Sequence, residues 1–320
     1  AGQAVLLRLL EKADVLIENY KPGTMEKWGL GFEAVLSEKF PRLIHCRVSG
    51  FGSDGPWGGF PGYDAIIQAM AGWCSVNGEA GSTPTRLGLA MVDRGTGLYS
   101  AVAILMALAE REKSQQGQYL DMTLYDCAVS LMHPHIPNYM YSGKVPEATG
   151  NAHPNISPYD TFRTKTVDIF IGAGNDRAYA KMCVELGREE LITDSRFLKN
   201  IDRVTNRDDL KAEIESSLMK IDGNEIADRL ATAGLAAGAI YNTAQVVDNV
   251  HTKHREMVIE DDWYKMTGTP IKFSRTPGSG RHKPPKFGQH TREILHEFDF
   301  SDQEVQELLA ADTALEKRQS

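Results

Sequence analysis

The first part of the chain alternates between short apolar segments and longer segments whose apolar residues recur with helical periodicity. Short apolar runs rich in β-branched residues predict strands at residues 14–19, 43–49 and 117–124. The helical pattern predicts helices at 4–10, 24–30, 32–38, 63–75, 98–108 and 125–133. Strands that alternate with helices are typical of an α/β fold with an open parallel, Rossmann-like sheet. In such sheets ligands bind beyond the carboxyl ends of the strands.

The pattern changes near Pro134, where prolines and a turn-rich stretch at 143–158 interrupt it. A second alternation follows, with strands predicted at 159–162, 167–171 and 239–241 and helices at 177–186, 206–219 and 223–233. A final helix is predicted at 302–309. We therefore predict a large discontinuous domain and a smaller α/β domain. The large domain comprises 1–140 and 265–320, the small one 150–250, and the linkers 141–149 and 251–264.

One acid stands out because of its position before the most apolar predicted helix. Asp93 ends a short apolar run and is followed by a predicted glycine-spaced turn at 94–97, after which the helix 98–108 begins. An acid in this position is often a helix N-cap, which accepts hydrogen bonds from the first helical amides. It is also a possible nucleophile, because a carboxylate can attack a thioester and form a covalent acyl intermediate. The local pattern leaves both interpretations open.

Composition limits the kinds of molecule that the protein is expected to bind. The 320 residues carry a formal net charge of −8, which argues against a nucleic-acid partner. The four cysteines are far apart in sequence, so neither a zinc site nor a disulfide framework is predicted. No uninterrupted apolar run reaches the roughly 18 residues of a membrane span, and we expect no membrane partner.

The beginning of the chain and its composition lead to two further expectations. The chain starts inside a helical pattern without an initiator Met, and we expect upstream sequence to be missing. Unpaired cysteines favour a cytoplasmic location, or a mitochondrial one if a targeting segment stood upstream.

Two other motifs give a weaker indication of function. The segment Gly-Ala-Gly-Asn at 172–175 is either a plain strand-to-helix turn or a loop whose amides cap an anionic centre. His133 and His135 flank a proline without a third spaced ligand, so no metal site is predicted. A serine-hydrolase elbow of the form G-x-S-x-G is absent from the sequence.

A series of motifs in order along residues 1–300 resembles the family III acyl-CoA transferases, of the formyl-CoA transferase and carnitine CoA-transferase type. These motifs are ADVLIENYKPGTMEKWGLG at 13–31, SGFGSDGP at 49–56, GYDAIIQAMAG at 62–72, GLAMVDRGTGLY at 88–99, GQYLDMTLYD at 117–126, GNAHPNISPYDTFRT at 150–164, GAGNDRAY at 172–179 and PPKFGQHT at 284–291.

The resemblance implies a role for Asp93. It makes this residue the nucleophile that attacks an acyl-CoA and passes through a mixed anhydride and an aspartyl-CoA thioester. The loop with Gly172, Gly174 and Asn175 would then shield the intermediate and supply backbone donors.

The resemblance also implies a coenzyme A site. Its residues would be Asn19, Tyr20, Pro22, Lys27, Ser49, Gly50 and Tyr63. Coenzyme A and acyl-CoA are substrates in this scheme, and no permanently bound cofactor is expected. Family members form interlocked homodimers and begin with a further N-terminal segment, so we expect a homodimer and regard activity of this chain as open.

Within the family, the strings TRLGLAMVD, GNAHPNISPY and GAGND resemble the branch that uses short dicarboxylic acids such as succinate, glutarate, citramalate, mesaconate and itaconate. The expected donor is succinyl-CoA. A second substrate carboxylate would need a cationic or amide-rich clamp, for which the candidates are Arg86, Asn151, His153 and Arg177.

Two alternatives remain beside the transferase interpretation. The first is an α-methylacyl-CoA racemase, a branch of the same fold that usually carries a His where this chain has Tyr63. A tyrosine, whose ordinary pKa is about 10, is a poor general base at neutral pH, so transfer is favoured. The second alternative is a catalytically impaired fragment that only binds coenzyme A.

Overall fold

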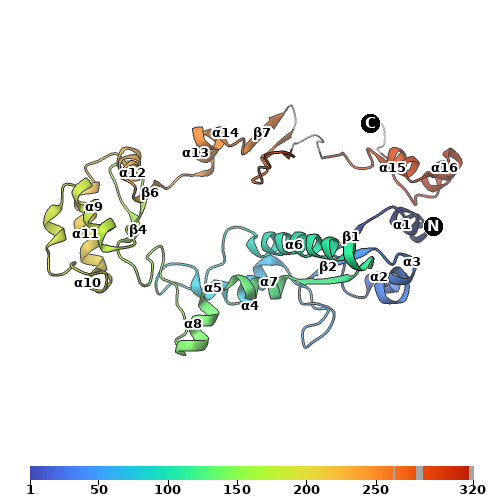
Figure 1. Cartoon of the computed structure of the whole chain (residues 1–320), viewed down its shortest axis with the longest axis horizontal. Coiled ribbons are helices and arrows are strands. Elements are labelled where there is room, and N and C mark those ends of the chain that lie inside the picture. Colours follow the sequence, from blue (N-terminus) through green and yellow to red (C-terminus); the bar gives the residue numbers. More distant parts are fainter. Residues whose placement is uncertain (262–263, 279–283, 317–320) are drawn as a thin grey trace. The chain divides into compact units, whose positions relative to one another are not determined.

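The computed structural model describes residues 1–261, 264–278 and 284–316, and it divides into two compact units (Figure 1). The first unit comprises Ala1–Ala148 and Pro284–Ser320, and the second comprises Thr149–Lys283. Intrachain contacts therefore group residues 265–278 with the second unit, whereas the sequence analysis placed them with the large domain. The physical reason is a hairpin, described below, that joins this segment to the residues before it.

A parallel sheet of three strands lies at the centre of the first unit. Its strands are β1 (Val15–Glu18), β2 (Ile44–Ser49) and β3 (Tyr119–Thr123), in the order β1-β2-β3. The register pairs Ile17 with Cys46 and Cys46 with Leu120. The prediction of a parallel α/β sheet is confirmed for these strands. All three end at the same edge, because parallel strands point the same way.

Helices connect the strands and cover the sheet. In chain order they are α1 (Gly2–Leu10), α2 (Thr24–Lys27), a π-helical turn (Phe32–Leu36), α3 (Ser37–Lys39), α4 (Asp64–Met70), α5 (Trp73–Val76), α6 (Met91–Ser114), α7 (Leu124–Leu131) and α8 (His135–Ser142). Helix α8 was not predicted, because prolines flank and interrupt it. Pro137 occupies its first turn, where a missing amide hydrogen costs nothing.

The C-terminal helices α15 (Thr291–Glu297) and α16 (Asp302–Ala310) return to the first unit and pack beside α1. Leu295, Phe300 and Val305 form a small buried cluster with Val5 at its margin. Arg8 of α1 forms an ion pair with Glu304 of α16 at 2.8 Å. This contact explains why the first unit is discontinuous in sequence.

Helix α6 differs from its prediction. The glycine-spaced turn expected at 94–97 is wrong, since the helix already begins at Met91 and runs for 24 residues through both glycines. The reason lies in the packing of α6 against α7. A Cβ on Gly95 would lie 2.6 Å from Cδ1 of Leu131, so this glycine provides close approach of the helices rather than a turn.

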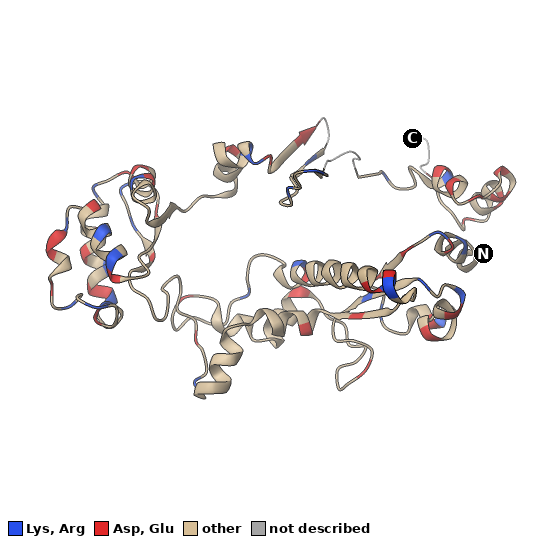
Figure 2. Ribbon diagram, viewed as in Figure 1, with Lys and Arg blue, Asp and Glu red and all other residues tan. Residues whose placement is uncertain are grey.

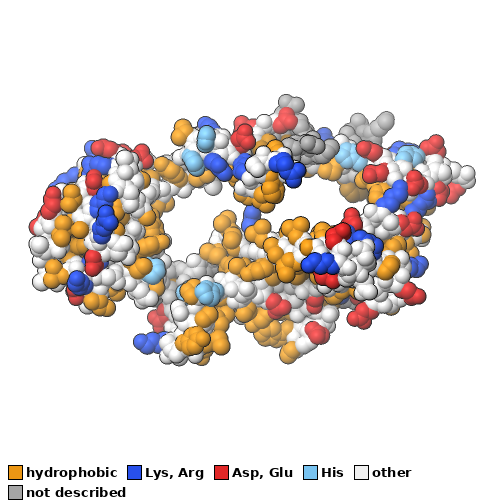
Figure 3. Space-filling model, viewed as in Figure 1, with side chains coloured by type: hydrophobic (Ala, Val, Ile, Leu, Met, Phe, Trp, Pro, Cys, Tyr) orange, Lys and Arg blue, Asp and Glu red, His pale blue; other side chains and the backbone are white. Residues whose placement is uncertain are grey.

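Much of the middle of α6 is apolar and exposed. Its charged residues lie at its two ends, and Figure 2 shows an uncharged ribbon between them. Hydrophobic side chains lie along the helix in Figure 3, and the large exposed ones include Leu98, Val102, Leu105 and Met106. Among the described residues α6 is the one helix long and apolar enough to qualify as a membrane span by length and composition. Core helices of globular domains meet the same criterion, and α6 packs on β2 and β3.

The second unit contains an antiparallel sheet and a separate helical layer. Its strands β4 (Tyr159–Phe162), β5 (Ile169–Gly172) and β6 (Ala236–Ala239) are ordered β4-β5-β6. The helices are α9 (Asp176–Glu185), a 3-10 turn (Glu189–Ile192), α10 (Asn200–Thr205), α11 (Arg207–Leu218) and α12 (Gly223–Thr232). The strand predicted at 239–241 lies three residues earlier. Ala237 pairs there with Ile171 on the central strand.

The remaining elements of this unit follow β6. They are α13 (Thr243–Asp248), α14 (Val250–His254) and the antiparallel hairpin of β7 (Val258–Asp261) and β8 (Tyr264–Thr267). The segment 251–264, predicted as a linker, thus holds most of α14 and all of β7. The hairpin also accounts for the grouping of residues 265–278 with this unit.

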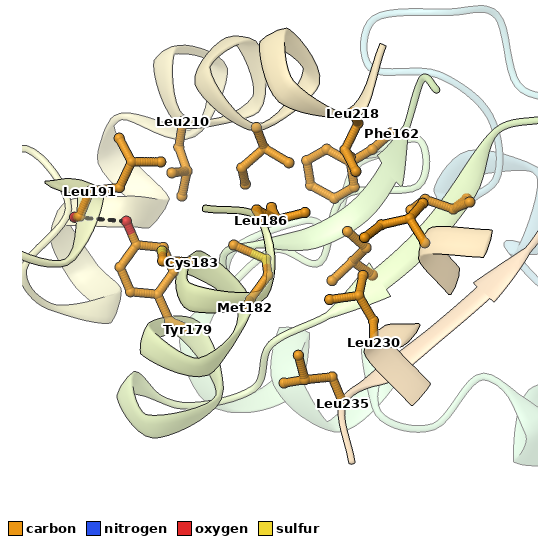
Figure 4. Packing of buried hydrophobic residues seen from close by; sticks show 14 of the residues in the cluster. Phe162, Tyr179, Met182, Cys183, Leu186, Leu191, Leu210, Leu218, Leu230 and Leu235 are labelled. Atoms are coloured by element: carbon orange, nitrogen blue, oxygen red, sulfur yellow. Dashed lines mark hydrogen bonds between the residues drawn. The ribbon is translucent and has the colours of Figure 1, made fainter. Parts of the chain in front are cut away.

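A well-packed core holds the second unit together (Figure 4). Tyr179 of α9 is 2% exposed, and its hydroxyl donates a hydrogen bond of 3.0 Å to the carbonyl oxygen of Leu191. The ring fills core volume while the hydroxyl satisfies a backbone acceptor in the 3-10 turn.

We expect Tyr179→Phe to lower the free energy of unfolding by about 1–2 kcal/mol, because the Leu191 carbonyl would lose its donor in a buried position. Urea unfolding followed by circular dichroism measures the change. Tyr141→Phe is the matched control, since Tyr141 is 93% exposed and its change should stay within about 0.5 kcal/mol. Equal effects in the two variants would contradict the importance of this hydrogen bond.

Candidate active site

The carboxyl edge of the parallel sheet carries a buried ion-pair network. Arg47 of β2 donates from Nε to Glu18 of β1 at 2.7 Å and from Nη2 to Glu26 of α2 at 2.6 Å. Glu18 also accepts a hydrogen bond from the Tyr20 amide. Burial alone would raise the pKa of the Glu18 carboxyl, but the neighbouring His45 and Arg47 outweigh it and hold that pKa below its ordinary value.

A cavity of about 540 Å³ opens above this network. Its wall combines the loop after β1, the π-helical turn and the strands β2 and β3. The lining residues are Pro22, Gly23, Glu26, Gly31, Phe32, Glu33, Ala34, Arg47, Ser53, Gly59 and Tyr119. Sequence analysis missed Glu18 and Arg47. The signal was present, because a charged residue inside an otherwise apolar strand needs a buried partner.

The residues predicted to bind coenzyme A lie at this edge of the first unit. Asn19, Tyr20, Pro22 and Lys27 belong to the connection from β1 through α2. Of these, Pro22 lines the cavity and Tyr20 contacts Trp28 edge-on, with ring centroids 5.0 Å apart. All four residues therefore lie in one short segment of the chain, and their role in binding coenzyme A stays a prediction.

The second predicted group at this edge follows β2. Ser49 accepts a hydrogen bond from the Gly52 amide at 3.0 Å. A Cβ on Gly50 would lie 2.7 Å from Cα of Gly62, so two glycines bring the loop after β2 against the residues before α4. Tyr63 follows directly and is 76% exposed. Ser49, Gly50 and Tyr63 thus lie at the two ends of the connection from β2 to α4.

Asp93 lies in the first turn of α6, but it is not the N-cap. That position belongs to Ala90, which has no side-chain acceptor, so the N-cap interpretation of Asp93 is wrong. The Asp93 side chain is exposed, and no described residue donates a hydrogen bond to it. Although the residue is exposed, neighbouring protein atoms partly shield its carboxyl from water, which raises the pKa above the ordinary value, and the negative charge of Asp64 raises it further.

Asp64 of α4 takes the place of a local cap. Its Oδ2 accepts hydrogen bonds from the Val92 amide at 2.8 Å and the Asp93 amide at 3.1 Å. The sequence analysis did not single out Asp64. An acid that opens one helix gives no sign, in sequence, that it also caps a second helix further along the chain.

Arg86, a candidate substrate residue, lies in the loop before α6. Its side chain is exposed, and Nη1 donates to the neighbouring Leu87 carbonyl at 2.9 Å. Arg86 therefore belongs to the same unit as Asp93, and no ion pair joins it to a carboxylate among the described residues.

The other predicted site residues belong to the second unit. Gly172 ends β5, and Asn175 is the N-cap of α9, where its side chain accepts the Ala178 amide at 2.9 Å. This confirms the strand-to-helix turn. Gly174 has open space where a Cβ would be, and Arg177 is exposed in the first turn of α9.

A buried arginine organises this glycine loop. Arg203 is fully buried and donates to Asp176 at 2.7 Å and to the Ser157 carbonyl at 2.8 Å. It thereby joins the loop after β5 to the segment before β4. The candidates Asn151 and His153 lie on that segment, where the His153 amide donates to the Tyr159 carbonyl at 3.0 Å.

Metal ligation finds no support in the part of the chain that the structure describes. Within residues 1–261, 264–278 and 284–316, no group of three or more His, Cys, Asp or Glu side chains is placed to hold an ion.

Comparison with known proteins assigns the family. The model of CoA-transferase family III matches residues 1–291. The chain belongs to this family. The resemblance seen in the sequence motifs is thereby confirmed.

Two relatives that are named as transferases show substantial similarity. An acyl-CoA transferase of Fusarium pseudograminearum is 38% identical over 92% of this chain and 66% of its own length. A succinate–glutarate CoA-transferase of Agrobacterium fabrum is 34% identical over 93% of this chain and 76% of its own length. The chain thus spans about two thirds to three quarters of these relatives.

A solved family III structure shows the same fold. The crystal structure of a CAIB/BAIF family protein from Brucella suis is 38% identical, covers 93% of this chain and 78% of its own, and has a TM-score of 0.84. At that level of identity and coverage the similarity extends over both units of this chain.

The buried network at the sheet edge generates a pH-dependent prediction. Glu18→Gln should lower the free energy of unfolding by about 1–3 kcal/mol at neutral pH, because Arg47 would lose one of its two anionic partners. The folded-state pKa of Glu18 lies below its ordinary value of 4.5. The stability that the carboxylate contributes is therefore fully present above pH 4.5 and is lost as the pH falls through the folded-state pKa.

The stability difference between wild type and Glu18→Gln should therefore be largest near neutral pH and shrink below about pH 4.5. Urea unfolding across this range measures it. Glu38→Gln is the control, because Glu38 is exposed in α3. A difference that stays constant down to the acid limit would show that the carboxylate charge is not responsible.

Proposed function

We propose that this chain transfers coenzyme A between carboxylic acids through a covalent intermediate on Asp93. The observation that carries the proposal is the state of this carboxylate. It is exposed at the start of α6 without a hydrogen-bond donor among the described residues, and its pKa is raised. A carboxylate with these properties is a better nucleophile than one bound by donors.

The reaction is a sequence of acyl exchanges. An Asp93 oxygen attacks the thioester carbonyl carbon of the donor, the carbon–sulfur bond breaks, and coenzyme A leaves as a thiolate. The thiolate attacks the Asp93 carbonyl carbon of the mixed anhydride, which releases the donor acid and leaves an aspartyl-CoA thioester.

The second half of the reaction runs in reverse with a new acid. The acceptor carboxylate attacks the aspartyl thioester and displaces the thiolate, giving a second mixed anhydride. The thiolate then attacks the acceptor's acyl carbon, which forms the new acyl-CoA and frees Asp93. Each step exchanges one acyl bond for another, so no oxidant or external base is required.

The second unit has a supporting role in this proposal. We assign the loop of Gly172, Gly174 and Asn175 to the developing oxyanion, because it connects the end of a strand to the start of a helix. The Ala173 amide already donates to the Pro158 carbonyl at 2.9 Å, so the donors would come from its neighbours. The coenzyme would lie along the residues at the sheet edge, from Asn19 to Lys27 and from Ser49 to Tyr63. These assignments come from the motifs, and the structure supplies the loop geometry.

The substrate class follows from the relatives and from the charged candidates. We propose succinyl-CoA as donor and a short dicarboxylic acid as acceptor, as the name of the Agrobacterium relative indicates for that protein. Arg86 and Arg177 are exposed cations that can receive the second carboxylate, with Asn151 and His153 as polar partners. Racemisation is disfavoured, because Tyr63 stands where a histidine base is needed.

A homodimer is part of the proposal. Exposed apolar side chains at helical spacing on α6, among them Leu98, Val102 and Leu105, make a surface that a partner subunit would cover. The interlocked form of that dimer remains a prediction.

The first experiment incubates the chain with succinyl-CoA and traps the intermediate with hydroxylamine. Mass spectrometry should find a hydroxamate on the peptide that carries Asp93. Asp93→Asn should give no hydroxamate and lose roughly a thousandfold or more in turnover. Asp126→Asn is the matched control, because Asp126 is an exposed first-turn acid of α7. Turnover retained in Asp93→Asn would exclude the mechanism.

The substrate assignment has its own test. Glutarate should be a better acceptor than pentanoate by roughly ten- to a hundredfold in kcat/KM, because one charge-assisted contact is worth about 1.5–3 kcal/mol. Arg86→Ala or Arg177→Ala should remove this preference while leaving pentanoate unchanged. Equal use of the two acids by the wild type would show that no clamp for a second carboxylate exists.

A further inference from the structure

The start of α6 is fixed by a residue from another helix. Helix N-termini leave their first amides without partners, and a side chain directly before the helix normally accepts them. Ala90 cannot do so, and Asp64 of α4 accepts the Val92 and Asp93 amides instead. The carboxylate of one helix therefore caps the helix that carries the proposed nucleophile.

A second residue of α4 secures this arrangement. Gln68 is fully buried and lies one helical turn after Asp64. Its Nε2 donates to Asp64 Oδ1 at 2.5 Å and to the Leu89 carbonyl at 3.2 Å, while its Oε1 accepts the Leu87 amide at 2.8 Å. Gln68 thus holds both Asp64 and the loop that enters α6, so the cap and the helix start are fixed together.

This cap has a consequence for Asp93. Acids in the first turn of a helix are normally stabilised by the free amides and by the positive end of the helix dipole. Here Asp64 occupies the amides of Val92 and of Asp93 itself, so they are not available to the Asp93 carboxylate. The bound Asp64 also places a second negative charge beside Asp93.

We propose that Asp64 is a positioning residue for the reaction: by capping α6 from α4 it fixes the backbone of Asp93, denies the Asp93 carboxylate the helix amides, and so keeps it available for attack. This inference rests on the proposed function of Asp93 but concerns a different residue. Asp64 forms no bond to substrate in this scheme and acts only through Asp93.

The charges around Asp93 agree with this assignment. Partial burial and the charge of Asp64 are the causes of the raised pKa of Asp93. Two other charged residues on the elements concerned are Arg94, which follows Asp93 in α6, and Asp126, in the first turn of α7, the helix that packs on α6. Neither is among those causes, so the effect is specific to the residue that caps the helix.

The test compares Asp64→Asn and Asp64→Ala with the wild type and with Asp126→Asn. Asn keeps an oxygen for the two amides and removes the charge, whereas Ala removes both. Carbon-13 NMR titration of aspartate-labelled protein, with the Asp93 signal assigned by Asp93→Asn, measures the pKa of Asp93 directly. Rapid-quench trapping measures the rate at which succinyl-CoA acylates Asp93. Coenzyme A binding and thermal unfolding are recorded for every variant.

We expect the pKa of Asp93 to fall in both Asp64 variants and to stay unchanged in Asp126→Asn. Acylation should slow by roughly ten- to a hundredfold in Asp64→Ala, because a displaced nucleophile loses its alignment, and by less in Asp64→Asn. The acid limb of the pH–rate profile should move to lower pH in both. Affinity for coenzyme A should change by less than about twofold, since Asp64 is not among its proposed ligands.

The opposite results would overturn the inference. An Asp93 pKa and an acylation rate in Asp64→Asn equal to those of Asp126→Asn would show that Asp64 is only structural. If Asp64→Ala fails to fold, the comparison with Asp64→Asn decides alone. A wild type without an acyl adduct would refute the proposed function, while the titration would still decide whether Asp64 controls Asp93.

Discussion

Parallel pairing of β1, β2 and β3 is the constraint on which the first unit depends. Parallel neighbours cannot be joined by a tight turn, so each connection must cross back over the sheet, here through helices. This crossover brings the loops after β1 and β2 to one edge and lays α6 against β2 and β3. The buried pair of Arg47 and Glu18 then joins two strands at that edge, where an uncompensated charge would be costly.

The chemistry proposed for Asp93 depends on how α6 begins. A helix that starts with Ala90 and Met91 has no acceptor of its own, and Asp64 supplies one from α4. The same contact that stabilises the helix therefore sets the electrostatic surroundings of the carboxylate. Gln68 extends this coupling to the loop before α6, so the stability of the helix start and the reactivity proposed for Asp93 depend on one hydrogen-bonded set of groups.

The second unit is stabilised by a hydrophobic core and a buried arginine. Its antiparallel sheet is covered by helices whose apolar faces share one continuous core, and a buried arginine, Arg203, anchors the polar segments around the glycine loop. Asn175 caps α9 at that loop, which leaves the strand-to-helix turn well defined. A well-packed support of this kind suits the role proposed for this loop, which needs backbone amides held in fixed positions.

The sequence by itself determined the family and the existence and type of most helices and strands, and it singled out Asp93 as the candidate nucleophile. Periodicity and ordered motifs are properties of the sequence, so they can be recognised without knowing which residues are in contact. Tertiary structure decided what depends on distant residues: that Gly95 lies inside α6 against Leu131, and that Ala236–Ala239 is the strand beside β5. It also decided that Asp64, rather than Asp93, caps the helix. The residues next to Asp64 in sequence give no sign that it caps another helix, because the amides it binds are brought near only by folding.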